Sequence, residues 1–222
     1  MENSKIITID GPSGVGKGTL AKNLSDELGW VVLDSGSLYR MVGYLSVKLK
    51  TKDFLKIKQE IEKQEISFSY LNDSSSISLF LDEENISSSI RNEDVAKSAS
   101  EFATIPEVRD FLFSIQRSFS FKGPGLIADG RDMGTVVFPE AKWKFFLTAS
   151  AEERARRREN QLKESGLSVN MPNLLQSIKE RDNKDSSRKL SPLMPAEDAL
   201  VIDSSEIGIL ELKQKVLKII RE

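Results

Sequence analysis

The sequence contains neither cysteine nor histidine among its 222 residues. This excludes disulfide bonds and thiolate metal sites, and it also excludes histidine-based triads, general bases and metal clusters. The 32 basic and 34 acidic residues give a formal net charge of −2, so no overall field attracts nucleic acid or a membrane surface. Apolar runs are all shorter than a membrane-spanning helix requires, and residues 1–5 are mostly polar. We therefore expect a cytoplasmic protein without a nucleic-acid or membrane partner, in which any basic site is local.

What the sequence does contain is a glycine-rich turn between an apolar run at 6–10 and a segment with helical spacing of leucines. This order of strand, loop and helix is the context that a phosphate-binding loop requires. The loop consists of Gly11, Pro12, Ser13, Gly14, Val15, Gly16, Lys17, Gly18 and Thr19. Its glycines let backbone N–H groups turn toward phosphate oxygens, and the positive end of the following helix lies at the same place. The loop therefore predicts binding of a nucleoside triphosphate.

Two side chains of this loop are candidates for direct contact with the ligand. Lys17 can reach the outer phosphates, and Thr19 can offer its hydroxyl to Mg²⁺. The general pattern has serine or threonine directly after the lysine, and here Gly18 stands at that position.

Further apolar runs predict four more strands of the same sheet, separated by helical patterns. These runs are 30–33, 126–129, 143–147 and 199–203. Alternation of strands and helices predicts an α/β fold with a parallel sheet covered by helices. Segments 66–70 and 77–81 alternate with period two and predict a hairpin, with 86–90 as a further short strand. Because an antiparallel hairpin does not fit into a parallel sheet, residues 63–91 are expected to form a small insert.

Charged residues also follow two of the predicted strands. Asp129 ends a strand and is followed by Arg131 and Asp132, which places a carboxylate where an acid that organises Mg²⁺ would lie. Arg40 occupies the first turn of the helix after the second strand. That position is compatible with a solvated arginine and equally with one near the phosphate loop.

Two predicted helices carry charged side chains spaced three and four residues apart, which places them on one helix face. In the first helix they are Arg154, Arg157 and Arg158. In the second helix they are Arg181, Asp185 and Arg188. The first set is either an exposed basic surface or part of a mobile flap that clamps phosphates. By itself, the second set is typical of a surface ladder of ion pairs.

Several of these stretches together closely resemble bacterial-type cytidylate kinases, which are P-loop nucleoside monophosphate kinases. The matching stretches are 9–19, 33–36 with Tyr39 and Arg40, 127–134 and 179–182, and the likeness extends from Ile7 to Asp203. The resemblance implies a single three-layer P-loop kinase domain, 1–222, with a five-stranded parallel sheet, helices on both faces, a small antiparallel β insert and a helical lid. It places the core at about 1–35, 106–150 and 190–222, the monophosphate-binding insert at about 36–105 with its β subdomain at 63–91, and the lid at about 151–170.

The resemblance also implies an activity and a set of site residues. The activity is Mg²⁺- and ATP-dependent transfer of the γ-phosphoryl group to CMP or dCMP, which gives the diphosphate. Positions that match Arg40 and Arg131 hold the acceptor phosphate in that family, and those that match Ser100, Arg109 and Asp132 read the cytosine edge. Contacts to the ribose or to phosphates are implied for Ser35, Arg181, Asp185 and Arg188, and Asp129 is expected in the same CMP site.

The catalytic residues implied are Lys17, Arg131 and the lid arginines Arg154, Arg157 and Arg158. Mg²⁺ is expected at Thr19, with Asp34 or Asp129 reaching it through water. Since the acceptor is already an anionic phosphate oxygen, no general base is required, and the missing histidine is no objection. The substrates are then small molecules, ATP and CMP or dCMP, and we expect a monomer.

Three alternatives stay open from the residues alone. A P-loop kinase for another small acceptor, such as UMP, AMP or a sugar or shikimate-like acid, would contain the same loop. A nucleotide-dependent regulatory switch would need mobile loops that read the γ-phosphate. Binding of nucleic acid through 154–158 would give an affinity with steep salt dependence.

Overall fold

The computed structural model describes residues 5–70, 77–164, 166 and 168–222. Residues 71–76 of the predicted insert and residues 165 and 167 of the predicted lid lie outside this part, as do residues 1–4. A parallel five-stranded sheet forms the centre, in the order β2-β6-β1-β7-β8. Its strands are β1 (Ile6–Asp10), β2 (Val31–Asp34), β6 (Leu126–Gly130), β7 (Trp143–Thr148) and β8 (Leu200–Asp203). The predicted α/β fold with five parallel strands is confirmed.

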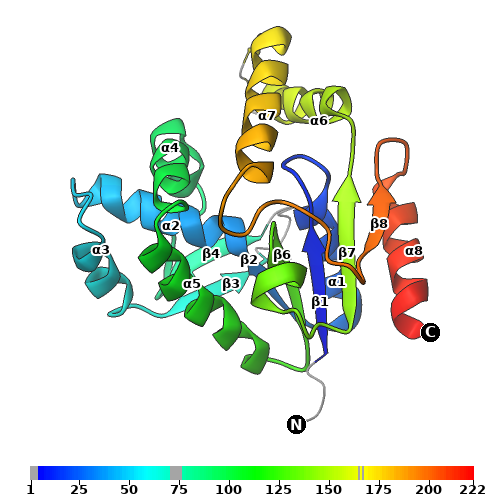
Figure 1. The fold of residues 1–222 in the computed structure, drawn as a ribbon, viewed down its shortest axis with the longest axis horizontal. Coiled ribbons are helices and arrows are strands. Elements are labelled where there is room, and N and C mark those ends of the chain that lie inside the picture. The colour runs from blue at the N-terminus through cyan, green and yellow to red at the C-terminus, as the bar shows by residue number, and fades with distance from the viewer. Residues whose placement is uncertain (1–4, 71–76, 165, 167) are drawn as a thin grey trace.

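Helices cover both faces of this sheet, which makes three layers (Figure 1). The α-helices are α1 (Lys17–Leu28), α2 (Ser35–Lys48), α3 (Phe54–Ile61), α4 (Glu93–Phe102), α5 (Pro106–Ser118), α6 (Ala151–Glu164), α7 (Met171–Ser186) and α8 (Ile209–Arg221). On one face, Leu24 of α1 and Val216 of α8 are buried with Ile9 of the central strand. On the other face, Leu38 of α2 and Leu112 of α5 pack in a second core. The inner strands β6, β1 and β7 are buried on both faces and mostly apolar for this reason, whereas the edge strand β8 is largely exposed.

The predicted insert forms a small antiparallel sheet in the order β3-β4-β5. Its strands are β3 (Ile66–Ser69), β4 (Ser78–Leu81) and β5 (Glu84–Asn85). The strand predicted at 86–90 was wrong, because a short 3₁₀ turn (η1, Ser89–Arg91) occupies part of that segment. The backbone N–H of Ile90 donates to the carbonyl oxygen of Ile86 at 3.0 Å, so the chain turns there and buries both isoleucines in the core.

α6 and α7 lie beyond the carboxyl ends of the parallel strands, where the loops of the sheet gather (Figure 1). Ligands bind at this edge in open α/β sheets. None of the helices in the described ranges is long and apolar enough to cross a membrane.

α2, which carries Arg40, crosses α4 in close contact at Gly43. A Cβ atom at Gly43 would lie 2.7 Å from the carbonyl oxygen of Val95 and 2.8 Å from the amide nitrogen of Ala99. We expect Gly43→Ala to lower the free energy of unfolding by about 1–3 kcal/mol, because the two backbones must separate. Denaturant titration measures the change. Gly208→Ala is the matched control, since a Cβ there meets open space, and equal stability of the two variants would contradict the prediction.

Candidate active site

The phosphate loop has the backbone conformation that its glycines predict. Gly11, Gly14 and Gly16 have backbone φ angles of 144°, 84° and 95°, which residues other than glycine rarely adopt. At Gly11 a Cβ would also lie 2.2 Å from the carbonyl oxygen of Leu147, because the loop packs closely on the end of β7. The loop is thus fixed against the sheet at the N-terminus of α1.

Lys17 is the first residue of α1, and its side chain is buried next to Asp129 at the end of β6. Its Nζ donates to the carbonyl oxygen of Pro12 at 3.0 Å and lies 3.7 Å from Oδ1 of Asp129. Burial and the cation of Arg131 lower the pKa of Lys17, whereas Asp129 opposes the shift. Burial raises the pKa of Asp129, and Lys17 opposes it. Each charge therefore depends on the other for stability in this desolvated place.

Gly18 stands where the general loop pattern has serine or threonine. A Cβ at this position would lie 3.5 Å from Oδ2 of Asp129, an ordinary van der Waals distance, so the structure does not require glycine there. Thr19 is exposed on α1, and no contact in the described part of the chain joins it to Asp129 or Asp34. Asp34 caps α2, with its carboxylate accepting from the N–H and the hydroxyl of Ser37 at 3.1 and 2.6 Å.

Asp10, the last residue of β1, links the phosphate loop to the turn after β6. Its Oδ1 accepts the N–H of Met133 at 2.9 Å, and its Oδ2 accepts the N–H of Gly134 at 2.7 Å. Burial raises the pKa of Asp10 to about 6, although these two N–H groups oppose the shift. Both oxygens of Asp10 accept from backbone N–H groups, and both oxygens of Asp34 accept from Ser37, so Asp129 is the better candidate for holding metal-bound water, with Asp34 as the alternative.

Arginines from three separate segments lie close together at the carboxyl-terminal edge of the parallel sheet. Nε of Arg131 donates to Oδ2 of the buried Asp185 at 2.9 Å, and Arg188 pairs with the other oxygen of Asp185. Burial alone would raise the pKa of Asp185, but Arg131 and Arg188 outweigh it and lower the pKa. Solvent reaches Arg181, yet the surrounding protein and the cation of Arg131 lower the pKa of Arg181, and Arg40 and Arg188 add to this shift.

Arg40 joins the same group from α2. Its Nη1 donates to the carbonyl oxygen of Ile90 at 2.9 Å. Burial lowers the pKa of Arg40 against the opposing Asp34, and the nearby cation of Arg158 lowers it further. Throughout the described ranges, Arg40, Arg158 and Arg181 form no ion pair with a carboxylate. Such an excess of cations, repelling one another, is what a polyanion would stabilise.

A second polar pair lies beside these arginines. Nη2 of Arg109, on α5, donates to Oδ2 of the buried Asp132 at 2.5 Å. The guanidinium group of Arg109 also lies over the ring of Tyr39, 5.8 Å from its centroid. Ser100 is exposed on α4, where its hydroxyl donates to the carbonyl oxygen of Ala96, and no described contact joins it to this pair.

Ser35, at the start of α2, has a partner that sequence reasoning missed. Its buried hydroxyl accepts a hydrogen bond from Nε2 of Gln116 at 2.8 Å. Gln116 lies on α5, two turns after Arg109 on the same side of the helix. The spacing of seven residues between Arg109 and Gln116 is the sequence signal that could have identified Gln116 as part of the site.

The three arginines of α6 have different surroundings. Arg154 is buried and pairs with Asp182 of α7. Arg157 pairs with Glu153 and donates to the carbonyl oxygen of Ser204. Arg158 is exposed and donates to Oε1 of Gln161 at 3.3 Å. Only Arg158 therefore combines an exposed side chain with proximity to Arg40.

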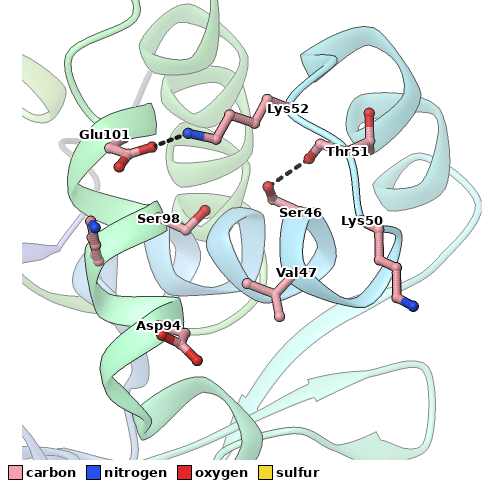
Figure 2. A pocket seen from close by; sticks show the side chains of 9 residues that line it. Ser46, Val47, Lys50, Thr51, Lys52, Asp94, Ser98 and Glu101 are labelled. Carbon is pink, nitrogen blue, oxygen red and sulfur yellow. Dashed lines mark hydrogen bonds and ion pairs between the residues drawn. The ribbon is translucent and has the colours of Figure 1, made fainter.

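A separate hollow of about 380 Å³ lies between α4 and the C-terminal end of α2 (Figure 2). Ser46 on its wall donates to the carbonyl oxygen of Thr51 at 2.6 Å, and Lys52 pairs with Glu101 at 2.9 Å. Since Ser46 is eleven residues beyond Ser35 on α2, the hollow is about 16 Å along the helix from the site. It is therefore distinct from the group of arginines at the phosphate loop.

A phosphate loop at the end of a central parallel strand, with a buried lysine–aspartate pair and facing arginines, defines a P-loop phosphotransferase. The family model for cytidylate kinase matches residues 7–222. The chain belongs to the cytidylate kinase family.

Curated relatives agree with this assignment. The chain is 50% identical to a cytidylate kinase of Colwellia psychrerythraea over 218 residues, which cover 97% of this chain and 96% of that protein. It is 48% identical to a cytidylate kinase of Shewanella denitrificans, with 98% and 96% covered. A crystal structure of an uncharacterized protein from Eubacterium ventriosum has a TM-score of 0.52 over 98% of both chains. At 13% identity, this last likeness concerns the fold alone.

Proposed function

We propose that the protein transfers the γ-phosphoryl group of ATP to CMP or dCMP and that the residues described above carry out this reaction. The observation that carries the proposal is the group of arginines around Arg131, whose charge acts on Lys17 of the phosphate loop and on Arg181 of α7. Two polyanions must approach end to end in this reaction, and their repulsion is the main obstacle. Positioning and charge neutralisation are therefore the chemistry that the site must supply.

On the donor side, the backbone of Gly11–Thr19 would surround the β- and γ-phosphates, and Lys17 would bind them. To reach them, the ammonium group gives up its hydrogen bond to the Pro12 carbonyl and keeps its proximity to Asp129. Because the lysine is already buried, little solvent has to be removed when the phosphates arrive.

Oxygen ligands of the kind that Mg²⁺ prefers are present beside the loop. In the described part of the chain no three acidic residues are grouped so as to enclose a metal ion. Such a site suits an ion that keeps several waters and takes its other ligands from phosphates. Asp129 and Asp34 would hold those waters, and the hydroxyl of Thr19 is a further candidate. Bound Mg²⁺ supplies neutralisation of the charge on the transferred group.

On the acceptor side, Arg40 and Arg131 would hold the phosphate of CMP, and Arg181 and Arg188 would meet the ribose or phosphates together with Asp185. Arg109 and Asp132 face each other with the groups that a cytosine edge requires. Cytosine presents a ring carbonyl and a ring nitrogen that accept from an arginine, and an amine that donates to a carboxylate. Ser100 and Ser35 complete the proposed nucleotide site.

Above both substrates, the arginines of α6 would contact the transferring phosphoryl group and exclude water. Exclusion of water matters because water competes with CMP as the acceptor. Arg158 is the best placed of the three, since Arg154 and Arg157 are engaged with Asp182 and Glu153.

A screen of acceptors with ATP and Mg²⁺ tests the proposal. We expect CMP and dCMP to be phosphorylated with the highest kcat/KM, and UMP, AMP, shikimate and gluconate to be far poorer. Preference for any other acceptor would overturn the assignment of the substrate. Absence of turnover with every acceptor, despite binding of ATP, would favour a nucleotide-dependent switch instead.

Asp132→Ala tests the proposed recognition of cytosine. We expect the ratio of kcat/KM for CMP to that for UMP to fall by about tenfold or more, since the exocyclic amine loses its acceptor. The KM for ATP should change little, because Asp132 lies on the acceptor side. Asp110→Ala is the control, an exposed carboxylate next to Arg109 in sequence. An unchanged CMP-to-UMP ratio in Asp132→Ala would count against this role.

A further inference from the structure

Arg154 has contacts that connect three parts of the molecule. Its Nη1 and Nη2 donate to the two carboxylate oxygens of Asp182 on α7, at 2.9 and 2.6 Å. Nη1 also lies 3.3 Å from the carbonyl oxygen of Ser13 in the phosphate loop, to which it donates. Nε donates to the carbonyl oxygen of Ala149 at 3.1 Å. The two-pronged pair fixes both the distance and the plane of the guanidinium group, as a single hydrogen bond would not.

This pair lies directly against the phosphate loop. A Cβ atom at Gly14 would lie 3.2 Å from Cβ of Arg154, so the backbone of the loop and the arginine stem are in contact. The side chain of Arg154 is 5% exposed and that of Asp182 is 24% exposed, which shields the interaction from solvent. A shift of the loop when phosphates bind would therefore be felt by α7 through Asp182.

α7 carries the acceptor-side charges on neighbouring residues. Arg181 precedes Asp182 directly, and Asp185 comes three residues later, where it pairs with Arg131. Since a helix moves as one body, a displacement at Asp182 also displaces the groups at Arg181 and Asp185. The donor loop and the acceptor arginines are thus joined by an unbroken series of contacts.

We propose that Asp182 is a positioning residue that couples occupation of the phosphate loop to the binding of the acceptor nucleotide. It acts through Arg154 and touches neither substrate. The inference rests on the proposed function, because it takes ATP and CMP as the two ligands. Coupling of this kind is reciprocal, so that each nucleotide strengthens the binding of the other by the same factor.

A purely structural role for Asp182 predicts something different, and the chain offers a matched comparison. Lys179 and Glu152 also join α7 to α6, at 3.2 Å, but their side chains are 50% and 66% exposed. This second pair makes no described contact with the phosphate loop. If only the attachment of the two helices mattered, loss of either pair would have the same kind of effect.

The test uses the full chain and calorimetric binding of CMP, with and without a saturating non-hydrolysable ATP analogue and Mg²⁺. For the wild type we expect the analogue to lower the Kd of CMP by about 5-fold or more. In Asp182→Asn this factor should fall to near one, whereas the Kd of CMP alone should change little. Glu152→Gln should keep the wild-type factor. Asp182→Ser, which also removes the two-pronged pair with Arg154, should behave like Asp182→Asn and takes its place if that variant does not fold.

Two results would overturn the inference: a wild-type coupling factor in Asp182→Asn and Asp182→Ser, or an equal loss in Glu152→Gln. An absence of coupling in the wild type would also overturn it. Failure of the proposed function is distinguishable, because a wild type that does not phosphorylate CMP fails in the acceptor screen whatever the coupling factors are.

Discussion

Arg131→Ala is expected to lower kcat with CMP by about 10²–10³-fold, the usual cost of removing one preorganised donor from a site of developing charge. The side chain stands between the buried Lys17–Asp129 pair and Asp185, and its charge acts on the pKa of Lys17, of Asp129 and of Asp185. ATP affinity should stay within a few-fold of the wild type, because the phosphate loop is unaltered. Steady-state kinetics with CMP and equilibrium binding of an ATP analogue give the two quantities.

The control for this variant is Arg156→Ala. Arg156 lies on α6 with an exposed side chain and pairs only with Glu153 in the described contacts. Its loss should leave kcat near the wild-type value. Wild-type turnover in Arg131→Ala, or an equal decrease in Arg156→Ala, would contradict the role given to Arg131.

Lys17→Met should lower kcat at least as much, by about 10³-fold, and should also weaken the binding of ATP. Methionine keeps the length of the side chain and suits the buried position, so the fold should tolerate it. Asp129 then loses the larger of the two cationic contributions that offset its burial and keeps only that of Arg131 against Asp34 and Asp10. Single-turnover measurements at saturating ATP separate the loss in chemistry from the loss in binding.

Lys22→Met is the corresponding control on the same helix. Lys22 pairs with Asp26 near the surface, 2.7 Å away, and lies outside the phosphate loop. Its replacement should cost no more than a surface ion pair, about 1 kcal/mol of stability or less. Retention of activity in Lys17→Met would exclude Lys17 from the transfer step and leave the loop with a binding role at most.

Most of the fold could be predicted because the strands carry a strong local signal. Runs such as Ile6–Asp10 and Trp143–Thr148 are apolar and bounded by turns, and their burial on both faces is the physical reason for that pattern. The error at 86–90 has a matching cause. Ile86 and Ile90 are two apolar residues with serines between them, a spacing that fits either a short strand or a turn. The backbone hydrogen bond from Ile90 to Ile86 shows that the segment forms a turn.

Only part of the candidate site could be predicted from the sequence. Arg40 and Arg131 both lie close enough to Arg181 to lower its pKa, as the convergence of loops at one sheet edge predicts, and the roles of these residues stay predictions. The partners of those residues could not be predicted. Gln116 binds Ser35 across 81 positions of the sequence, and Asp182 reaches Arg154 across 28. Such pairings depend on how whole helices pack against one another. The spacing of residues along one helix does not predict that packing.

The two backbone hydrogen bonds of Asp10 have a consequence for the range of acceptors. They tie the first residue before the phosphate loop to the turn that begins directly after Arg131 and Asp132. These bonds therefore fix the distance between the phosphate loop and the turn that carries Arg131 and Asp132, whatever movement α6 and α7 make. A nucleoside diphosphate, longer than CMP by one phosphate, would have to displace either its base or the incoming γ-phosphoryl group. The enzyme should accordingly stop after a single addition and release CDP without extending it to the triphosphate.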